Sequence, residues 1–162
     1  MSPEAAVAFQ DRMPENHCWG CGADNPQGLR LKSRWDGEIA VAEWTPRPEH
    51  MAGPTHVLNG GIIATLLDCH TICTAVADAY RREGREVGDG ERIWYVTASL
   101  DIRYHRPTPI DAPLDLSARV VECDGRKTRV EGELRSAGKA RASCAVLAIR
   151  VDDEWLAHGR PA

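Results

Sequence analysis

The sequence has no excess of basic residues. Its 162 residues include 20 Lys and Arg against 24 Asp and Glu, which gives a formal net charge of -4. Nucleic acid phosphates are bound by clustered positive charge, so we expect no nucleic acid partner. A small basic cluster such as Arg126 and Lys127 is still sufficient for a single phosphorylated ligand.

Long apolar runs are also missing. No run approaches the roughly 20 residues that a helix needs to span a bilayer. Residues 1–10 lack the basic and then apolar pattern of a secretory signal. We therefore expect a cytoplasmic protein with no membrane partner. Hydrophobic residues make up 43% of the chain, which is enough for one domain with a substantial core.

The sequence lacks a second CxxC beside the one at Cys18 and Cys21. A structural zinc site usually needs four ligands, so we favour two reduced cysteines that shape a turn, and we expect no metal and no cofactor. A zinc or redox role for this pair is the alternative, with His17, His50 or His56 as further ligands in principle. Cys69 and Cys73 lie four residues apart in an apolar segment, where free cysteine behaves as a small buried hydrophobe.

One stretch organises the rest of the chain. The turn-forming Asn59-Gly60-Gly61 leads directly into the longest helix-like apolar segment, and we predict a helix that is capped by Asn59 and ends near Arg82. Asp68 is almost the only charge before Asp78, so a sheet should wrap this helix. A buried carboxylate is costly without a partner, which means that Asp68 needs either a catalytic or a structural explanation.

The remaining segments alternate apolar and polar residues, as half-buried strands do. We predict strands at residues 29–32, 39–44, 93–104, 114–120, 126–134 and 140–151, with tight hairpins at Asp36-Gly37 and Asp124-Gly125. The result is an α+β layout, in which a curved antiparallel sheet surrounds one central helix. We divide the chain into an N-terminal arm with the CxxC loop, which includes a short helix or surface arm, then the main domain and a loose C-terminal tail. Their ranges are 1–27, 28–152 and 153–162.

The central stretch resembles a known family. Asn59-Gly60-Gly61 followed by Asp68 is similar to the His-Gly-Gly…Asp signature of hotdog-fold acyl-CoA thioesterases of the phenylacetate-pathway and 4-hydroxybenzoyl-CoA type. Tyr104-His105-Arg106-Pro107, Gly125-Arg126-Lys127 and the leader from Cys18 to Leu29 also resemble parts of that family. The resemblance covers about Cys18 to Val151 and implies the hotdog fold. One departure is Asn59, which stands where many members carry His.

The resemblance implies hydrolysis of an acyl-CoA thioester to the free acid and CoA. It implies a homodimer or a dimer of dimers with the active site at the subunit interface. Asp68 would act as nucleophile or general base, and the Gly60 backbone N–H would bind the thioester oxygen. Thr97, from the other subunit, would help to position the water. The alternative is a non-catalytic acyl-CoA or small-ligand binding protein on the same scaffold.

The residues themselves support an interface site. Free N–H groups in the first turn of a helix can stabilise an oxyanion, and glycine allows close approach. Asp68 lies eight residues after Gly60, which is about 12 Å along a helix axis. The two residues of one chain therefore cannot act on the same bond, so a second copy of the helix or a partner strand must complete the site. His70 lies on a different face of the helix from Asp68 and is expected to be a core or interface histidine.

Several further residues are candidates for binding the substrate. His56, Asn59 and Gly61 surround the helix start, and cationic groups suit the phosphates of CoA. The cationic candidates are Arg106, Arg126 and Lys127. Each candidate also has a structural explanation. Asp68 could be a buried carboxylate paired with Arg or capped by Thr, the glycines an ordinary turn, Thr97 a simple strand residue, and the cations solvated surface charges.

Overall fold

The computed structural model describes residues 6–158, so expectations for residues 1–5 and 159–162 lie outside the described chain. A short 3-10 helix precedes two strands, a second 3-10 turn and the long helix, and four long strands and a short helix follow. The elements are η1 (Phe9–Arg12), β1 (Ser33–Asp36), β2 (Ile39–Trp44), η2 (Pro48–His50), α1 (Gly60–Arg82), β3 (Trp94–Tyr104), β4 (Leu114–Asp124), β5 (Lys127–Ser136), β6 (Lys139–Val151) and α2 (Asp153–Ala157).

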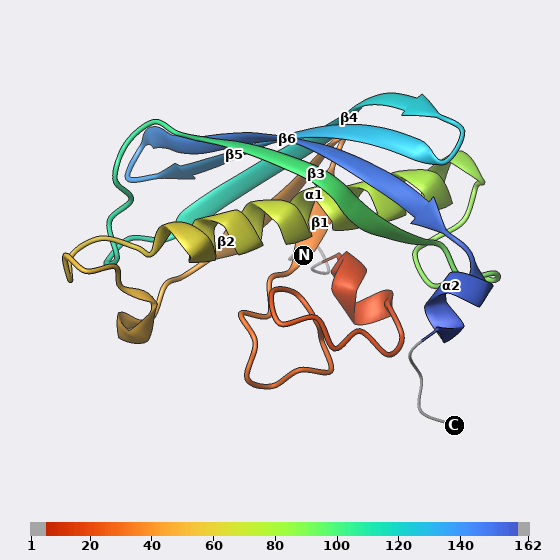
Figure 1. Ribbon diagram of the computed structural model, residues 1–162, viewed down its shortest axis with the longest axis horizontal. Helices are drawn as coiled ribbons and strands as arrows, with labels where there is room; N and C mark the ends of the chain where they lie inside the picture. The colour runs from red at the N-terminus through yellow and green to blue at the C-terminus, as the bar shows by residue number, and fades with distance from the viewer. Residues whose placement is uncertain (1–5, 159–162) are drawn as a thin grey trace, which may run out of the picture.

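All six strands form one antiparallel sheet in the order β1-β2-β4-β5-β6-β3. The sheet curves over one side of α1, and the N-terminal segment lies against the other side (Figure 1). This confirms the predicted α+β layout with one long helix inside a curved sheet. The long strand β3 and the short strand β1 are the two edges, so β3 has no neighbour on one side within the described residues.

Helix α1 begins and ends where the sequence predicted. The Asn59 side-chain oxygen accepts hydrogen bonds from the Gly61 and Ile62 backbone N–H groups, at 2.8 and 3.2 Å, and the helix ends at Arg82. By length and composition this helix is apolar enough to cross a membrane, contrary to the expectation that no such run exists. Because 67% of its most apolar window is buried inside the fold, α1 has the burial of a core helix.

The helix and the sheet lie close together at Gly132 on β5. A Cβ at this position would lie 3.0 Å from the Cys144 sulfur and 3.0 Å from a methyl carbon of Thr71 on α1, so a larger residue would push the two layers apart. His70 is fully buried between α1 and the sheet, where its ring nitrogens contact Ser33 Oγ at 2.9 Å and the Ala40 carbonyl at 3.1 Å. Burial lowers the pKa of His70 to about 4, which fits a neutral core histidine.

The predicted strand at residues 29–32 and the predicted loose tail are both wrong. Residues 29–32 belong to no strand, because Arg30 takes a positive φ of 55° and the neighbouring amides bond to a loop instead. The Leu29 N–H donates to the Trp19 carbonyl at 2.8 Å and the Leu31 N–H to the Gly20 carbonyl at 3.1 Å. The tail is also more ordered than expected, since the Asp152 side chain caps the short helix α2.

The N-terminal arm packs into the main core. Phe9 in η1 is buried, and its ring lies 5.2 Å from the Trp35 ring of β1. Met13 and Cys21 belong to the same buried cluster as the residues of α1 and the sheet. The expected short helix is therefore present, and it contributes to the core rather than resting on the surface.

Candidate active site

Asp68 lies in the third turn of α1, and its partner is Thr97 on β3. The Thr97 hydroxyl donates a hydrogen bond of 2.6 Å to the Asp68 carboxylate. Both residues belong to one chain, whereas the resemblance led us to expect Thr97 from the other subunit. Burial raises the pKa of Asp68 above its usual value, and the Thr97 hydrogen bond offsets part of that rise.

A β-bulge lies directly beside Thr97. The pairing of β3 with β6 shifts register between Thr97 and Ser99, so Ala98 has no opposite residue on β6. Bulges bend a strand and change the direction of a neighbouring side chain. Here the bulge is in the edge strand, next to the residue that contacts Asp68.

Asp68 and Thr97 line a cavity of about 290 Å³ between α1, β3 and the loop that carries the CxxC. Most of its wall is apolar or sulfur-containing, so the carboxylate is the main charged group that faces it. The other lining residues are Met13, Asn16, Cys18, Cys21, Cys69, Ile72, Cys73, Val76, Trp94, Tyr95 and Val96. An apolar cavity with a few convergent polar groups is the usual form of a small-molecule site.

The start of α1 presents a second polar feature. Asn59 occupies the Gly61 and Ile62 N–H groups, but no residue within 6–158 accepts a hydrogen bond from the Gly60 N–H. This exposed donor therefore remains available to a ligand. The Tyr104 hydroxyl donates to the Gly60 carbonyl at 2.7 Å. Sequence reasoning did not single out Tyr104 as a contact, although it begins the Tyr-His-Arg-Pro segment of the resemblance.

Four of the expected substrate-binding residues gather near the start of α1. His56 and Asn59 precede the helix, Gly61 is in its first turn, and the segment that follows Arg106 runs beside them. The Ile110 N–H donates to the His56 carbonyl at 3.1 Å, which fixes this arrangement. The four residues are therefore at the same end of the molecule as the Gly60 N–H.

The other two expected phosphate ligands lie at the opposite end. Arg126 is in the turn between β4 and β5, and its carbonyl accepts a 2.8 Å hydrogen bond from the Arg150 N–H. The Arg150 side chain pairs at 3.2 Å with Glu83, immediately after the last residue of α1. A helix of 23 residues is about 34 Å long, so one chain does not bring Arg126 and Lys127 to the Gly60 end.

Comparison with models of known protein families shows which family the chain belongs to. The model of the thioesterase superfamily matches residues 55–143, which is more than half of the chain and includes α1, β3, β4 and β5. The chain belongs to the thioesterase superfamily. Membership supports thioester hydrolysis as its general activity, and the observed sheet and helix have the hotdog fold of that superfamily.

Solved structures agree with this assignment. A thioesterase superfamily protein from Shewanella loihica PV-4 is 33% identical to this superfamily member with a TM-score of 0.61, covering 85% of this chain and 96% of that one. The E. coli PaaI protein from the phenylacetic acid degradation operon is 17% identical with a TM-score of 0.62, covering 76% of this chain and 81% of that one. A phenylacetic acid degradation-related protein from Ralstonia eutropha JMP134 is 20% identical with a TM-score of 0.60, covering 75% of this chain and 85% of that one.

At their level of identity, the E. coli and Ralstonia proteins show the fold alone. Among curated proteins, no sequence matches this thioesterase superfamily member significantly.

Two cysteine pairs that are far apart in the sequence of this superfamily member lie close together in its structure. Cys69 and Cys73 of α1 face Cys18 and Cys21 of the preceding loop, and all four line the cavity. Thiols of Cys18, Cys69 and Cys73 surround Cys21 and hold its pKa well below its usual range. The helical spacing of Cys69 and Cys73 was the sequence signal for this cluster, because residues four apart share a helix face.

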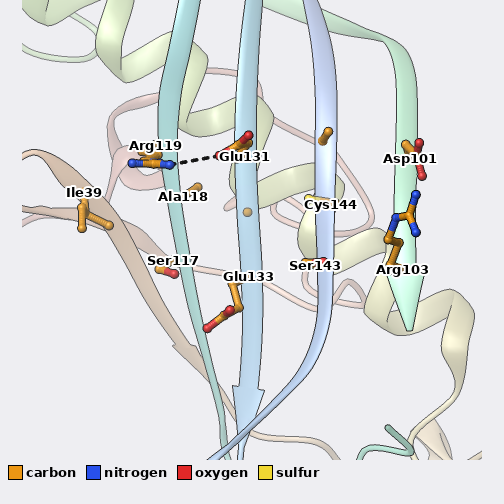
Figure 2. A pocket seen from close by; sticks show the side chains of 12 residues that line it. Ile39, Asp101, Arg103, Ser117, Ala118, Arg119, Glu131, Glu133, Ser143 and Cys144 are labelled. Atoms are coloured by element: carbon orange, nitrogen blue, oxygen red, sulfur yellow. Dashed lines mark hydrogen bonds and ion pairs between the residues drawn. The ribbon is translucent and has the colours of Figure 1, made fainter. Parts of the chain in front are cut away.

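A larger depression lies across β3, β4, β5 and β6 and holds about 610 Å³ (Figure 2). It is lined by charged side chains, among them Arg119 and Glu131, whose ion pair of 3.2 Å bridges β4 and β5. None of the predicted catalytic or substrate-binding residues lines this surface. We therefore assign the candidate active site to the cavity beside Asp68.

Proposed function

We propose that the protein hydrolyses an acyl-CoA thioester to the free acid and CoA. The observation that carries this proposal is the Asp68–Thr97 pair, which lies in the wall of an apolar cavity at the free edge of the sheet. The cavity has room for an acyl group, and among residues 6–158 Asp68 is the only carboxylate that lines it. Superfamily membership supports the thioester class, whereas the acyl-CoA substrate is our inference from the candidate phosphate ligands.

Asp68 can act on the thioester in two ways. As a general base, it takes a proton from water while the water oxygen bonds to the carbonyl carbon, and the C–S bond then breaks to release the CoA thiolate. As a nucleophile, its carboxylate oxygen attacks the carbonyl carbon, and water hydrolyses the resulting anhydride. Thr97 holds one Asp68 oxygen at 2.6 Å, which orients the carboxylate. A raised pKa makes this carboxylate a stronger base than an ordinary Asp.

The developing oxyanion needs a donor, and the Gly60 N–H meets that need. It lies at the positive end of the α1 dipole and has no acceptor among residues 6–158. Because Gly60 and Asp68 of one helix are about 12 Å apart, we assign the donor to the Gly60 of a second copy. The site is then complete only in an oligomer.

The free edge of β3 supports a homodimer, or a dimer of dimers built from it. This strand has 11 residues and exposes much of its length, and such an edge pairs readily with another strand. Two copies related by a two-fold axis would place the start of one α1 near the end of the other. That arrangement is also what would bring Arg106 of one copy and the Arg126 turn of the other to a single CoA.

Substitution of Asp68 by Asn tests the mechanism. The Asn side chain has the same shape and can still accept the Thr97 hydrogen bond, but it cannot take a proton or attack. We expect turnover to fall about 10²–10⁴-fold, measured as release of free acid from a panel of acyl-CoAs. Asp78→Asn on the same helix is the matched control, because Asp78 pairs with Arg82 at 2.6 Å and does not line the cavity. It should retain wild-type turnover.

The outcomes separate the proposal from its alternatives. Wild-type turnover in the Asp68→Asn variant would overturn the catalytic role of this carboxylate. A wild-type protein that binds acyl-CoAs without hydrolysing any member of the panel would instead be a binding protein on the same scaffold. The panel also identifies which acyl group fits the cavity.

A further inference from the structure

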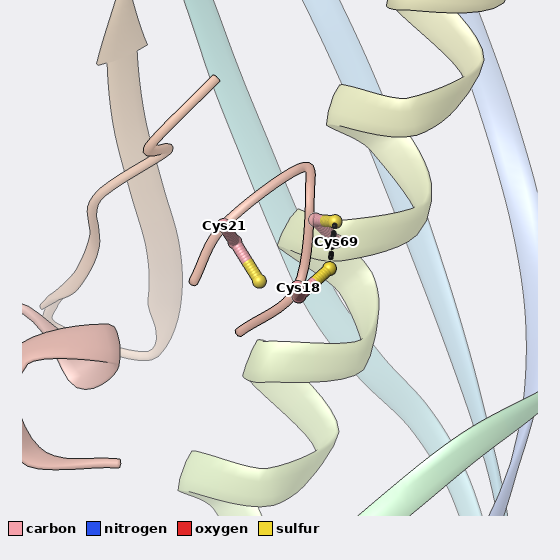
Figure 3. Close-up of side chains that lie close together, drawn as sticks. All are labelled: Cys18, Cys21 and Cys69. Atoms are coloured by element: carbon pink, nitrogen blue, oxygen red, sulfur yellow. Dashed lines mark hydrogen bonds between the residues drawn. The ribbon is translucent and has the colours of Figure 1, made fainter. Parts of the chain in front are cut away.

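Four cysteines from two distant segments meet beside the cavity. Cys18 and Cys21 come from the loop before β1, and Cys69 and Cys73 come from successive turns of α1. The sulfurs of Cys18 and Cys69 are 3.7 Å apart, and those of Cys21 and Cys73 are 3.8 Å apart. The sulfurs of Cys18, Cys21 and Cys69 all lie within 4.8 Å of one another, and Figure 3 shows Cys18 and Cys21 of the loop beside Cys69 of the helix.

These distances suit a single metal ion. A tetrahedral zinc site with Zn–S bonds of about 2.3 Å places its sulfurs about 3.8 Å apart. A disulfide would bring the sulfurs to about 2.05 Å, and all six cysteines of the chain are free. Iron–sulfur clusters occupy the centre of their cysteine set, so their ligand sulfurs lie farther apart than those around one ion. Thiolate ligands favour zinc over magnesium or calcium.

The backbone around the cluster is built to hold the loop against the helix. A Cβ on Gly20 would overlap the Cys69 sulfur and lie 2.7 Å from a methyl carbon of Thr65. A Cβ on Gly22 would lie 2.5 Å from the Cys18 nitrogen and from the Asn16 carbonyl. Backbone atoms exclude a larger residue at Gly22, and a larger residue at Gly20 would displace two side chains of α1, so the loop lies directly on the helix at the level of the sulfurs.

Hydrogen bonds within the loop also set its conformation. The Gly22 N–H donates to the Cys18 carbonyl at 2.8 Å, which closes the turn around the CxxC. The Asn16 side-chain oxygen accepts the Cys18 N–H at 3.1 Å, and its amide nitrogen lies 3.9 Å from the Cys21 sulfur. These bonds orient Cys18 and Cys21 toward the helix.

We propose that Cys18, Cys21, Cys69 and Cys73 bind one Zn²⁺ ion through four thiolates. Cys73 is the ligand that must move most, since its sulfur contacts Cys21 but lies outside the group of three sulfurs that are within 4.8 Å of one another. A change of its side-chain rotamer would have to supply that movement. The ion ties residues 18–21 to the middle of α1 and fixes the cavity wall beside Asp68. This role is structural and does not depend on the proposed acyl-CoA activity.

The direct test is the metal content of the full-length protein, purified under reducing conditions from cells grown with added zinc. We expect about one zinc per chain, since structural sites of this type hold a single ion. Exchange with Co²⁺ should give the visible absorption of tetrahedral cobalt and a strong sulfur-to-cobalt charge-transfer band. A zinc-free protein, a Co²⁺ spectrum of six-coordinate cobalt, or a mass that reveals Cys18–Cys69 and Cys21–Cys73 disulfides would overturn the proposal.

Variants assign the ligands. Cys18→Ser alters a partly exposed thiol at the edge of the cluster and should lose its zinc during gel filtration with a competing chelator, whereas wild type keeps it. Cys123→Ser is the matched control, because Cys123 is exposed in β4 and does not line the cavity that the four cysteines share. Cys73→Ser should lower the charge-transfer intensity of the cobalt form by about a quarter. Full zinc retention in Cys18→Ser, or an unchanged cobalt spectrum in Cys73→Ser, would refute the four-thiolate site.

Discussion

The Gly60 N–H can be removed without removing the helix. Gly60 is the first residue of α1, where proline fits because its missing N–H has no helical partner. The preceding Asn59 has φ -59° and ψ 131°, a conformation that a following proline favours. We expect Gly60→Pro to keep the fold and lower acyl-CoA turnover about 10²–10³-fold, the usual effect of losing one oxyanion donor.

Gly60→Ala is the control for this prediction. It keeps the N–H, and its added Cβ would lie 3.7 Å from the Tyr104 ring, which is ordinary contact. The alanine variant should therefore turn over substrate at close to the wild-type rate. Equal loss of activity in both variants would show that the space at Gly60 matters rather than the donor.

At the residue scale, the sequence predicted which residues form the candidate site better than it predicted which residues contact one another. The spacing of Gly60 and Asp68 and the cap at Asn59 follow from helix geometry, which is local. The Thr97 contact with Asp68 depends on a bulge in β3 and on how this strand crosses α1, and no local pattern encodes either. The cysteine cluster was missed for the same reason, because the CxxC and the helical pair meet only in the folded chain.

At the scale of the element, Asn59 explains why α1 starts where it does. Its side chain accepts two backbone N–H groups that otherwise have no partner in the helix. We expect Asn59→Ala to lower the free energy of unfolding by about 1 kcal/mol, measured by chemical denaturation at a fixed protein concentration. Asn59→Asp should keep the wild-type stability, because Asp caps helices equally well and its charge suits the helix N-terminus.

The Asn59 variants also separate capping from substrate binding. If Asn59 only caps, Asn59→Asp should retain activity together with stability. Full stability combined with a large rise in KM would instead show that the Asn side chain contacts the substrate. Stability unchanged in Asn59→Ala would contradict the capping role.

Element boundaries show where the sequence pattern misleads. The alternation at residues 29–32 is real, since Leu29 and Leu31 are both buried, but the backbone pairs with residues 19 and 20 rather than with a strand. Alternation of apolar and polar residues shows only that one side of a segment is buried. A segment that pairs with a loop gives the same alternation as a strand in a sheet. By contrast, the hairpins at Gly37 and Gly125 are where the sequence predicted, because both glycines take positive φ in tight turns.

At the scale of the whole molecule, a mixing experiment tests whether the active site spans two chains. Asp68→Asn and Gly60→Pro chains are each expected to be inactive alone. In a mixed dimer, one site combines the intact Gly60 of one chain with the intact Asp68 of the other. Random reassortment gives about half mixed dimers with one working site each, so about a quarter of wild-type activity should return.

This complementation has a clear opposite result. If both residues act within one chain, no mixture regains activity, although mixed dimers form. A pair of Asp68→Asn chains that carry different affinity tags, mixed in the same way, measures the extent of subunit exchange and controls for failure to reassort. A protein that stays monomeric at working concentrations would exclude the interface site directly.

The bulge at Ala98 lets the two parts of β3 use different sequence positions for the same face of the sheet. Side chains of a strand alternate between its two faces, yet the inward side chains are Tyr95 and Thr97 before the bulge and Leu100 and Ile102 after it. The extra residue accounts for this change, because Thr97 and Ser99 lie opposite consecutive residues of β6. Loss of Ala98 itself would therefore keep every side chain on its present face, whereas loss of another residue of β3 would turn part of the strand over.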